Sequence, residues 1–245
     1  MSEYMDASYG KAPKDGITFF NDYLPQKTGD VDPKQIKKGT TTVGLICSDG
    51  LVLAADKRAT MGYFIAGKQV DKIHQLDDRI AMTIAGGVGD AQTLVRIMKA
   101  ELALYKMRND SPLTVHGAMT LLSNILYQYK FYPFYVQLIL GGFDSKPSIY
   151  NLDALGGVTS ENVISTGSGS PMSYGLLEDA YKENKPIKEN LKLAARAIAV
   201  AMKRDVATGE GIDLIHITKT EFKRYSADEV KKIIEAGKAE RAEKD

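Results

Sequence analysis

Residues 39–56 read GTTTVGLICSDGLVLAAD and carry the clearest β-strand signal of the chain. Two apolar runs, at 41–48 and 51–56, enclose the turn residues Ser48-Asp49-Gly50, a pattern typical of a β-hairpin. Threonine is a good strand former because its branched Cβ fits a pleated surface. By themselves, the three threonines that follow Gly39 therefore indicate an ordinary strand.

The segments that follow this hairpin alternate between strands and pairs of helices. A second pair of strands, at 70–76 and 79–86, surrounds the Asp77-Asp78 turn, so the first fifty residues after Thr40 have the pattern of an antiparallel sheet. Helical spacing and cap residues then predict further elements in this order: a helix capped by Asp90, a helix capped by Ser111, strands within 135–153 and around Val163, helices from Ser170 toward Asn184 and over 188–205, a strand at 212–218, and a tail helix opened by Ser226 and Glu229.

The order of these elements predicts the fold class. Paired helices separated by antiparallel strands favour an α+β fold, a four-layer α-β-β-α sandwich of two antiparallel sheets, over a doubly wound parallel sheet. Residues 1–39 show no period of 2 or 3.6 and indicate an extended or weakly structured leader. The charged tail, 226–245, is typical of a solvated helix, and a contact with a partner is the alternative.

Composition excludes several classes of function. The 245 residues include 32 Lys and Arg against 31 Asp and Glu, so no overall field attracts nucleic acid or an anionic membrane. No apolar run approaches the length of a membrane span, and the first ten residues lack a signal core. The single cysteine, Cys47, lies in an apolar strand pattern and has no internal disulfide partner. These features predict a cytoplasmic, soluble protein.

The Gly39-Thr40 bond is the position with the most distinctive chemistry. If this bond is cut, Thr40 holds a nucleophilic hydroxyl and a free α-amine on one residue. The amine has an ordinary pKa of about 7.7 to 8.0, so it accepts a proton near neutral pH without a histidine. Gly39 can adopt the tight turn that brings its carbonyl onto the hydroxyl, because it has no Cβ.

Further along the chain, several polar residues and glycines follow in a specific order. They are Asp56 with Arg58, Lys72, the pair Gly86-Gly87, Ser168, and Asp205 with Thr208. With Thr40, this set resembles the catalytic proteasome β subunits of the N-terminal nucleophile hydrolases, most closely the archaeal type. The resemblance extends from Gly39 to about Thr218 in motif type, order and spacing.

The resemblance implies a role for each of these residues. Thr40 corresponds to the nucleophile, freed when the chain cuts itself after Gly39 and releases residues 1–39 as a propeptide. Asp56 and Lys72 correspond to the acid and the lysine that flank the threonine hydroxyl. An ammonium group there favours a developing alkoxide, and the carboxylate keeps it oriented.

Four more positions complete the implied site. Gly86 corresponds to the glycine whose backbone N–H helps to hold the oxyanion. Ser168 and Asp205 correspond to the groups that bond the threonine amine and its surroundings. The family usually has serine where this chain has Thr208. The uncut chain is then a precursor without peptidase activity.

The same resemblance places a substrate pocket beside the nucleophile. Ile84 corresponds to the base of this pocket, and its walls correspond to Ala59, Thr60 and Val70. The apolar members predict cleavage after Leu, Phe or Tyr. The resemblance also implies that no metal or cofactor is needed and that the substrates are unfolded polypeptides. It further implies a ring of seven such subunits stacked on a second ring, outer rings of proteasome α subunits, and an ATPase that feeds the particle.

Two other functions remain as alternatives. One is an amidase or acylase of the same superfamily, and the other is a ring subunit that assembles without cutting.

The glycine-rich segments at 84–91 and 166–171 lack the phosphate-binding pattern GxxxxGK[ST], so they indicate turns. The histidines, at 74, 116 and 216, are not paired at metal-binding spacing.

Overall fold

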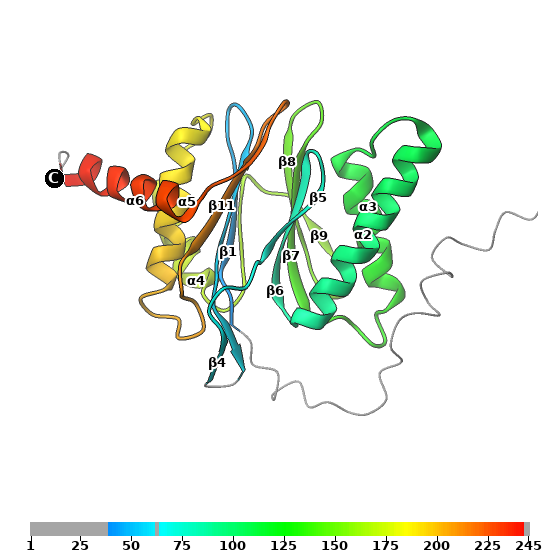
Figure 1. Ribbon diagram of the computed structural model, residues 1–245, viewed down its shortest axis with the longest axis horizontal. Helices are drawn as coiled ribbons and strands as arrows, with labels where there is room; N and C mark the ends of the chain where they lie inside the picture. The colour runs from blue at the N-terminus through cyan, green and yellow to red at the C-terminus, as the bar shows by residue number, and fades with distance from the viewer. Residues whose placement is uncertain (1–38, 62–63, 243–245) are drawn as a thin grey trace, which may run out of the picture. The chain divides into compact units, whose positions relative to one another are not determined.

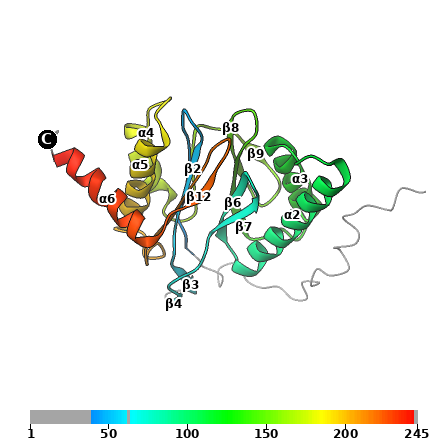
Figure 2. The ribbon, with the colours of Figure 1, turned by 45° about the horizontal axis from the view of Figure 1, so that its top comes forward.

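The computed structural model describes residues 39–61 and 64–242 and confirms the four-layer arrangement. Figure 1 shows two sheets face to face, with α4, α5 and α6 outside one of them and α2 and α3 outside the other. The view in Figure 2 keeps the same order of layers. The described helices are α2 (Val88–Asn109), α3 (Val115–Gln128), α4 (Ser170–Ala180), α5 (Ile187–Ala201) and α6 (Ala227–Ala242).

The two large sheets each contain five strands, and all their pairings are antiparallel. The first sheet has the order β10 (Val163–Thr166), β1 (Thr42–Ile46), β2 (Leu51–Asp56), β11 (Ile212–Ile217) and β12 (Phe222–Arg224). The second has the order β5 (Ile73–Asp77), β6 (Ile80–Gly86), β7 (Val136–Phe143), β8 (Pro147–Leu152) and β9 (Val158–Thr159).

Strand β2 is buried on both faces, which explains its unbroken apolar sequence. Leu51, Leu53 and Ala55 belong to the core between the two sheets. Val52 and Ala54, which point the opposite way, belong to the core under α4 and α5. The strand that ends in Asp56 is therefore fixed from both sides.

The structure divides the first strands differently from the single antiparallel sheet expected after Thr40. β1 and β2 lie in one sheet, whereas β5 and β6 lie in the other. A small hairpin of β3 (Ala59–Met61) and β4 (Phe64–Gly67), which the sequence analysis did not predict, lies between these two pairs in the chain. A period of two identifies a strand but does not say which sheet it joins.

Two predicted helix caps are wrong. Helix α2 begins after Gly87, and the Asp90 carboxylate in its first turn accepts a hydrogen bond from the Tyr135 N–H instead. Helix α3 is capped by Thr114, not Ser111, and the Thr114 hydroxyl accepts from the Gly117 N–H at 3.0 Å. The chain thus offered two hydroxyl residues near this helix start, and the later one forms the cap.

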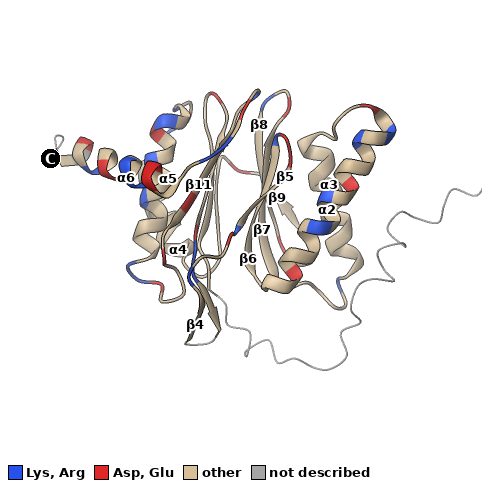
Figure 3. Ribbon diagram, viewed as in Figure 1, with Lys and Arg blue, Asp and Glu red and all other residues tan. Residues whose placement is uncertain are grey.

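The tail helix begins as predicted. The Ser226 N–H donates to the Glu229 carboxylate at 2.8 Å, and the Glu229 N–H donates to the Ser226 hydroxyl at 3.3 Å. Figure 3 shows residues of both charge signs along α2 and α6, whereas most residues of the strands are neither acidic nor basic. Among the described residues, no helix is long and apolar enough to span a bilayer.

Candidate active site

Thr40 lies next to the start of β1 and is 5% exposed. Its hydroxyl donates a hydrogen bond to the Gly39 carbonyl oxygen at 2.7 Å, across the peptide bond that joins the two residues. The Gly39 N–H in turn donates to the Thr60 hydroxyl at 3.1 Å. A Cβ on Gly39 would lie 1.6 Å from the Ala207 Cβ, so only glycine fits here.

The Asp56 carboxylate, at the end of β2, is fully buried and holds the Lys72 ammonium at 2.7 Å. The same carboxylate accepts three backbone N–H groups, those of Thr41 at 2.9 Å, Arg58 at 3.1 Å and Gly209 at 2.9 Å. Four donors on one carboxylate fix its position and leave little freedom to the lysine that it binds.

Lys72 precedes β5 and is 6% exposed. Burial lowers the pKa of its ammonium group below the ordinary value of 10.5, and the Asp56 charge only partly offsets this effect. The backbone also fixes this residue, because the Ile84 N–H of β6 donates to the Lys72 carbonyl at 2.9 Å. The lysine therefore combines a fixed position with a proton that is easier to release than usual.

Ser168, Asp205 and Thr208 form a second group, which contacts Thr40 through its backbone N–H. The Asp205 carboxylate oxygen Oδ2 accepts from the Ser168 hydroxyl and from the Thr208 hydroxyl, each at 2.5 Å. The Thr40 N–H donates to the Ser168 hydroxyl at 3.3 Å. Thr208 is 1% exposed, and its hydroxyl also pairs with that of Thr41 at 2.7 Å. The site therefore accommodates threonine where serine is usual.

Asp205 lies outside the helix in which the sequence analysis placed it. Helix α5 ends at Ala201, and Asp205 follows in the turns that lead to β11. The Asp205 N–H donates back to the Ala201 carbonyl at 2.8 Å. This loop brings the carboxylate to Ser168, which precedes α4.

Gly86 ends β6 and has a φ of +128°, a region that L side chains rarely adopt. A Cβ at this position would lie 2.1 Å from the Tyr135 carbonyl oxygen. The next residue, Gly87, donates its N–H to that same oxygen at 2.7 Å. Glycine is therefore required here by backbone conformation and by close packing.

A cavity of about 400 Å³ is lined by six of the twelve predicted residues, and the Asp56 carboxylate and the group of Ser168, Asp205 and Thr208 are not part of its wall. Thr60 is not part of its wall. Polar groups that the sequence analysis missed lie beside the expected apolar ones, and burial lowers the pKa of one of them, His74. The wall comprises the predicted Thr40, Ala59, Val70, Lys72, Ile84 and Gly86, and the additional Gln69, Asp71, His74, Val88, Ala91 and Gln92.

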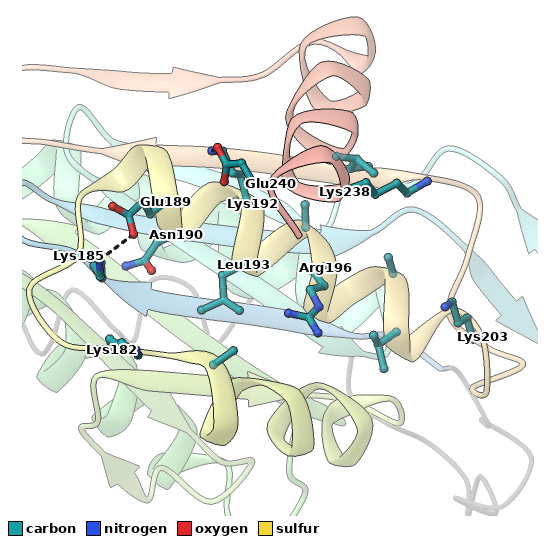
Figure 4. A pocket seen from close by; sticks show the side chains of 16 residues that line it. Lys182, Lys185, Glu189, Asn190, Lys192, Leu193, Arg196, Lys203, Lys238 and Glu240 are labelled. Carbon is teal, nitrogen blue, oxygen red and sulfur yellow. Dashed lines mark hydrogen bonds and ion pairs between the residues drawn. The ribbon is translucent and has the colours of Figure 1, made fainter. Parts of the chain in front are cut away.

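A second, larger cavity, of about 670 Å³, lies along α5, beside α6 and the end of α4, and contains none of the predicted site residues (Figure 4). Its wall is rich in lysine, and two of these lysines pair with glutamates, Lys185 with Glu189 and Lys192 with Glu240. Across residues 39–61 and 64–242, no cluster of histidine, cysteine and carboxylate side chains could hold a metal ion.

Comparison with known proteins places this constellation in a family. A family model described as "Proteasome subunit" matches residues 36–217, which include Gly39, Thr40 and every other predicted site residue. The chain belongs to the proteasome subunit family. A proteasome subunit beta of Methanosarcina thermophila is 56% identical over 203 residues, 82% of this chain and 97% of that protein.

Other archaeal proteasome β subunits are similarly close. The protein of Methanosarcina barkeri is 55% identical over 83% of this chain and 97% of its own length. The protein of Archaeoglobus fulgidus is 52% identical over 82% of this chain and 95% of its own length. These matches support a catalytic proteasome core subunit with threonine endopeptidase activity, and the antiparallel sandwich is consistent with the fold of that family.

Proposed function

We propose that this proteasome subunit hydrolyses peptide bonds with Thr40 as the nucleophile, once the Gly39-Thr40 bond has been cut. One observation carries the proposal: Thr40, Lys72 and Gly86 line the same cavity, and the Thr40 hydroxyl already contacts the Gly39 carbonyl at 2.7 Å. The proposal treats residues 1–39 as a propeptide, 40–225 as the catalytic domain and 226–245 as a charged helical tail.

The first step in this proposal is self-cleavage. The Thr40 oxygen attacks the Gly39 carbonyl carbon while a water takes the hydroxyl proton, because the amide nitrogen has no basic lone pair. The bond between that carbon and the Thr40 nitrogen then breaks, the nitrogen takes up a proton, and an ester remains. Water hydrolyses the ester to a Gly39 carboxylate, which leaves Thr40 with a free hydroxyl and a free amine.

In the mature subunit the same hydroxyl attacks a substrate peptide. The Thr40 amine takes the hydroxyl proton, directly or through a water, and delivers it to the leaving amine as the substrate C–N bond breaks. Water then hydrolyses the ester that remains on Thr40, which releases the acid product and frees the hydroxyl. The Lys72 ammonium, oriented by Asp56, favours the alkoxide that develops on Thr40. The group of Ser168, Asp205 and Thr208 holds the amine. The Gly86 backbone N–H donates to the oxygen of the tetrahedral intermediate. Judged by one such donor in another hydrolase, this hydrogen bond lowers the activation free energy by on the order of 3 kcal/mol.

The cavity supports a preference for cleavage after Leu, Phe or Tyr. Ala59, Val70 and Ile84 contribute apolar wall to it. In the uncut chain, the Thr60 hydroxyl binds the Gly39 N–H at 3.1 Å, which supports its assignment to the region that receives substrate. Faster turnover of fluorogenic peptides that end in Arg or Glu than of peptides that end in Leu, Phe or Tyr would overturn this preference.

Assembly follows from the family. The subunit forms part of a proteasome core with other subunits, as its β-subunit relatives are named. The finer proposal is a cytoplasmic particle with two inner rings of seven such subunits and outer rings of α subunits. It acts with an ATPase, degrades unfolded polypeptides in a closed chamber, and needs no metal or cofactor, because the nucleophile, base and donors are protein groups.

The N-terminal residue of the assembled particle and its peptidase activity test the proposal together. We expect an intact mass that begins at Thr40 and measurable peptidase activity in the native protein. Thr40→Ala should keep residues 1–39 and have no activity. An uncut but active chain, or an active Thr40→Ala variant, would contradict the mechanism. A cut, assembled chain without activity would indicate the non-catalytic alternative.

A further inference from the structure

A continuous chain of hydrogen bonds leads from the Thr40 nitrogen back to its neighbour in sequence. It passes from the Thr40 N–H to the Ser168 hydroxyl, 3.3 Å, and from there to Asp205 Oδ2, 2.5 Å. It continues to the Thr208 hydroxyl, 2.5 Å, and ends at the Thr41 hydroxyl, 2.7 Å. The first four of these groups belong to the proposed site, and Thr41 has no role in it so far.

The carboxylate determines the direction of every bond in this chain. A carboxylate only accepts, so the Ser168 and Thr208 hydroxyls both give their single proton to Asp205. With its proton used, the Thr208 oxygen must accept in its pair with Thr41. The Thr41 hydroxyl is therefore the donor. Each bond then polarises the next one along the chain.

The Thr41 hydroxyl is held unusually firmly. Thr41 is 0% exposed, and its backbone pairs with Asp56 through both its N–H, 2.9 Å, and its carbonyl, 3.2 Å. A branched Cβ restricts χ1 of threonine, so the hydroxyl does not rotate freely. A Cβ on Gly169 would lie 2.0 Å from this hydroxyl, so a glycine there leaves it room.

We propose that Thr41 is a positioning residue of the proteolytic site, whose hydroxyl orients the carboxylate and the serine that hold the Thr40 amine. The proposal rests on the function proposed above. Thr41 contacts both halves of the site, since its backbone binds Asp56 and its side chain binds Thr208. It touches no reacting atom and acts through these partners.

The pH profile should report this role. Without the Thr41 hydroxyl, Thr208 donates less strongly to Asp205, and the carboxylate keeps more of its negative charge. A less neutralised carboxylate favours the protonated Thr40 amine and raises its pKa. Less free amine is then present at a given pH, so the acid limb of the activity profile moves to higher pH.

Other charges around this amine remain the same in the test. Lys72 shares the cavity with Thr40 and pairs with Asp56 at 2.7 Å, and Asp205 accepts from Ser168 at 2.5 Å. Arg58 pairs with Glu210 at 3.3 Å and donates to the carbonyl of Val206, the residue after Asp205.

The neighbouring residue provides a matched control. Thr42 is also 0% exposed, and its hydroxyl pairs with that of Thr166 at 2.7 Å and accepts from that of Thr83 at 2.9 Å. Among the described residues, no hydrogen bond of this cluster connects it to the Thr40 amine. Thr42→Val and Thr41→Val therefore remove the same buried group from adjacent residues, with different expected effects on catalysis.

The experiment compares assembled particles of the native chain, Thr41→Val, Thr41→Ser and Thr42→Val. The N-terminus is determined by intact mass, and kcat and KM are measured from about pH 6 to 9 on chains that begin at Thr40. For Thr41→Val we expect kcat to fall about fivefold to tenfold, as for one lost hydrogen bond, with KM within about twofold. The acid limb should move up by about 0.3 to 0.5 pH units.

Thr41→Ser should recover most of this loss because it restores the donor, and Thr42→Val should keep the native kcat and acid limb. If Thr41→Val does not mature, the same variant is produced behind a fusion that a specific protease removes to expose Thr40. Equal kcat and acid limb in the native chain and Thr41→Val, or the same changes in Thr42→Val, would overturn the proposal. Failure of the proposed function is a distinct result, since it appears as an inactive native particle or an active Thr40→Ala.

Discussion

The Lys72 ammonium and the Asp56 carboxylate form a buried ion pair, with Nζ and Oδ1 2.7 Å apart and side chains 7% and 0% exposed. Removing one member of such a pair leaves the other charge buried and uncompensated, whereas exposed pairs contribute little. The stability of this subunit and its proposed chemistry therefore depend on the same contact.

The first prediction concerns Asp56→Asn. It leaves the Lys72 ammonium without its carboxylate and should lower the free energy of unfolding by about 3 to 5 kcal/mol. The substitution should also lower the pKa of Lys72 further. In the native protein, the Asp56 charge is the largest effect that raises this pKa against the lowering caused by burial. Denaturant unfolding measures the first effect, and peptidase activity should be largely lost.

Asp78→Asn is the matched control for this change. Asp78 pairs with Lys106 at 3.0 Å, but its side chain is 80% exposed. The free energy of unfolding should change by less than about 1 kcal/mol. Equal destabilisation by the two substitutions would mean that the Asp56 pair is not the structural contact described above.

The second prediction concerns maturation. Gly39→Ala places a Cβ 1.6 Å from the Ala207 Cβ, so the scissile carbonyl must move away from the Thr40 hydroxyl. Self-cleavage should become at least about tenfold slower, since small displacements of reacting groups are costly. Intact mass against time after assembly measures the rate.

A compensating substitution tests the cause. Ala207→Gly removes the methyl group that the new side chain meets, so the double variant should cut faster than Gly39→Ala alone. Cleavage of Gly39→Ala at the native rate would show that this contact does not control the position of the carbonyl.

The third prediction concerns the glycine pair at the end of β6. Gly86→Ala combines a φ of +128° with a clash of 2.1 Å against the Tyr135 carbonyl, so the backbone there must change. We expect kcat to fall by a factor on the order of 10² or more as the proposed oxyanion donor moves. Gly87→Ala is the control, because its Cβ would meet its nearest neighbour at an ordinary 3.6 Å. Similar kcat values for the two variants would exclude a special role for Gly86.

The fourth prediction is a pH dependence of the tail helix. Hydrogen bonds from the Ser226 backbone and from Lys223 lower the pKa of Glu229 from 4.5 to about 2. A carboxyl group whose pKa is lower in the folded than in the unfolded state stabilises the fold at pH values above its ordinary pKa. This stabilisation is therefore present above pH 4.5 and is lost as the pH falls toward 2.

Glu229→Gln should thus lower the melting temperature near neutral pH, and its difference from the native protein should shrink as the solution is acidified below pH 4.5. Glu235→Gln, on an exposed part of the same helix, controls for the loss of a carboxylate. A difference between native protein and Glu229→Gln that stays constant down to about pH 3 would contradict the prediction.

The sequence predicted the parts of this structure that local pattern determines. The hairpin of β1 and β2 follows from two apolar runs around the turn at Gly50, and the start of α6 follows from the spacing of Ser226 and Glu229. The cap at Asp90 failed because a tertiary contact with Tyr135 uses that carboxylate. Asp205 was placed in a helix because neither glycine nor proline marks the end of α5 at Ala201.

The candidate site was predicted through its motifs, while its connections required the fold. The Asp56 carboxylate binds the Gly209 N–H, and the Thr41 hydroxyl binds Thr208, over separations of 153 and 167 residues. No local pattern indicates partners so far apart in the chain. The sequence also did not indicate that His74 lines the cavity beside Thr40. This residue lies in an ordinary strand pattern, and only the fold brings it to the cavity wall.

The hydrogen bond between the Thr40 hydroxyl and the Gly39 carbonyl has a practical consequence for labelling. As long as that peptide bond is intact, its own carbonyl occupies the place where a covalent inhibitor would have to approach the threonine oxygen. Inhibitor titration of a purified preparation should therefore count processed subunits alone. The ratio of bound inhibitor to total chain then gives the fraction of chains in the preparation that have been processed.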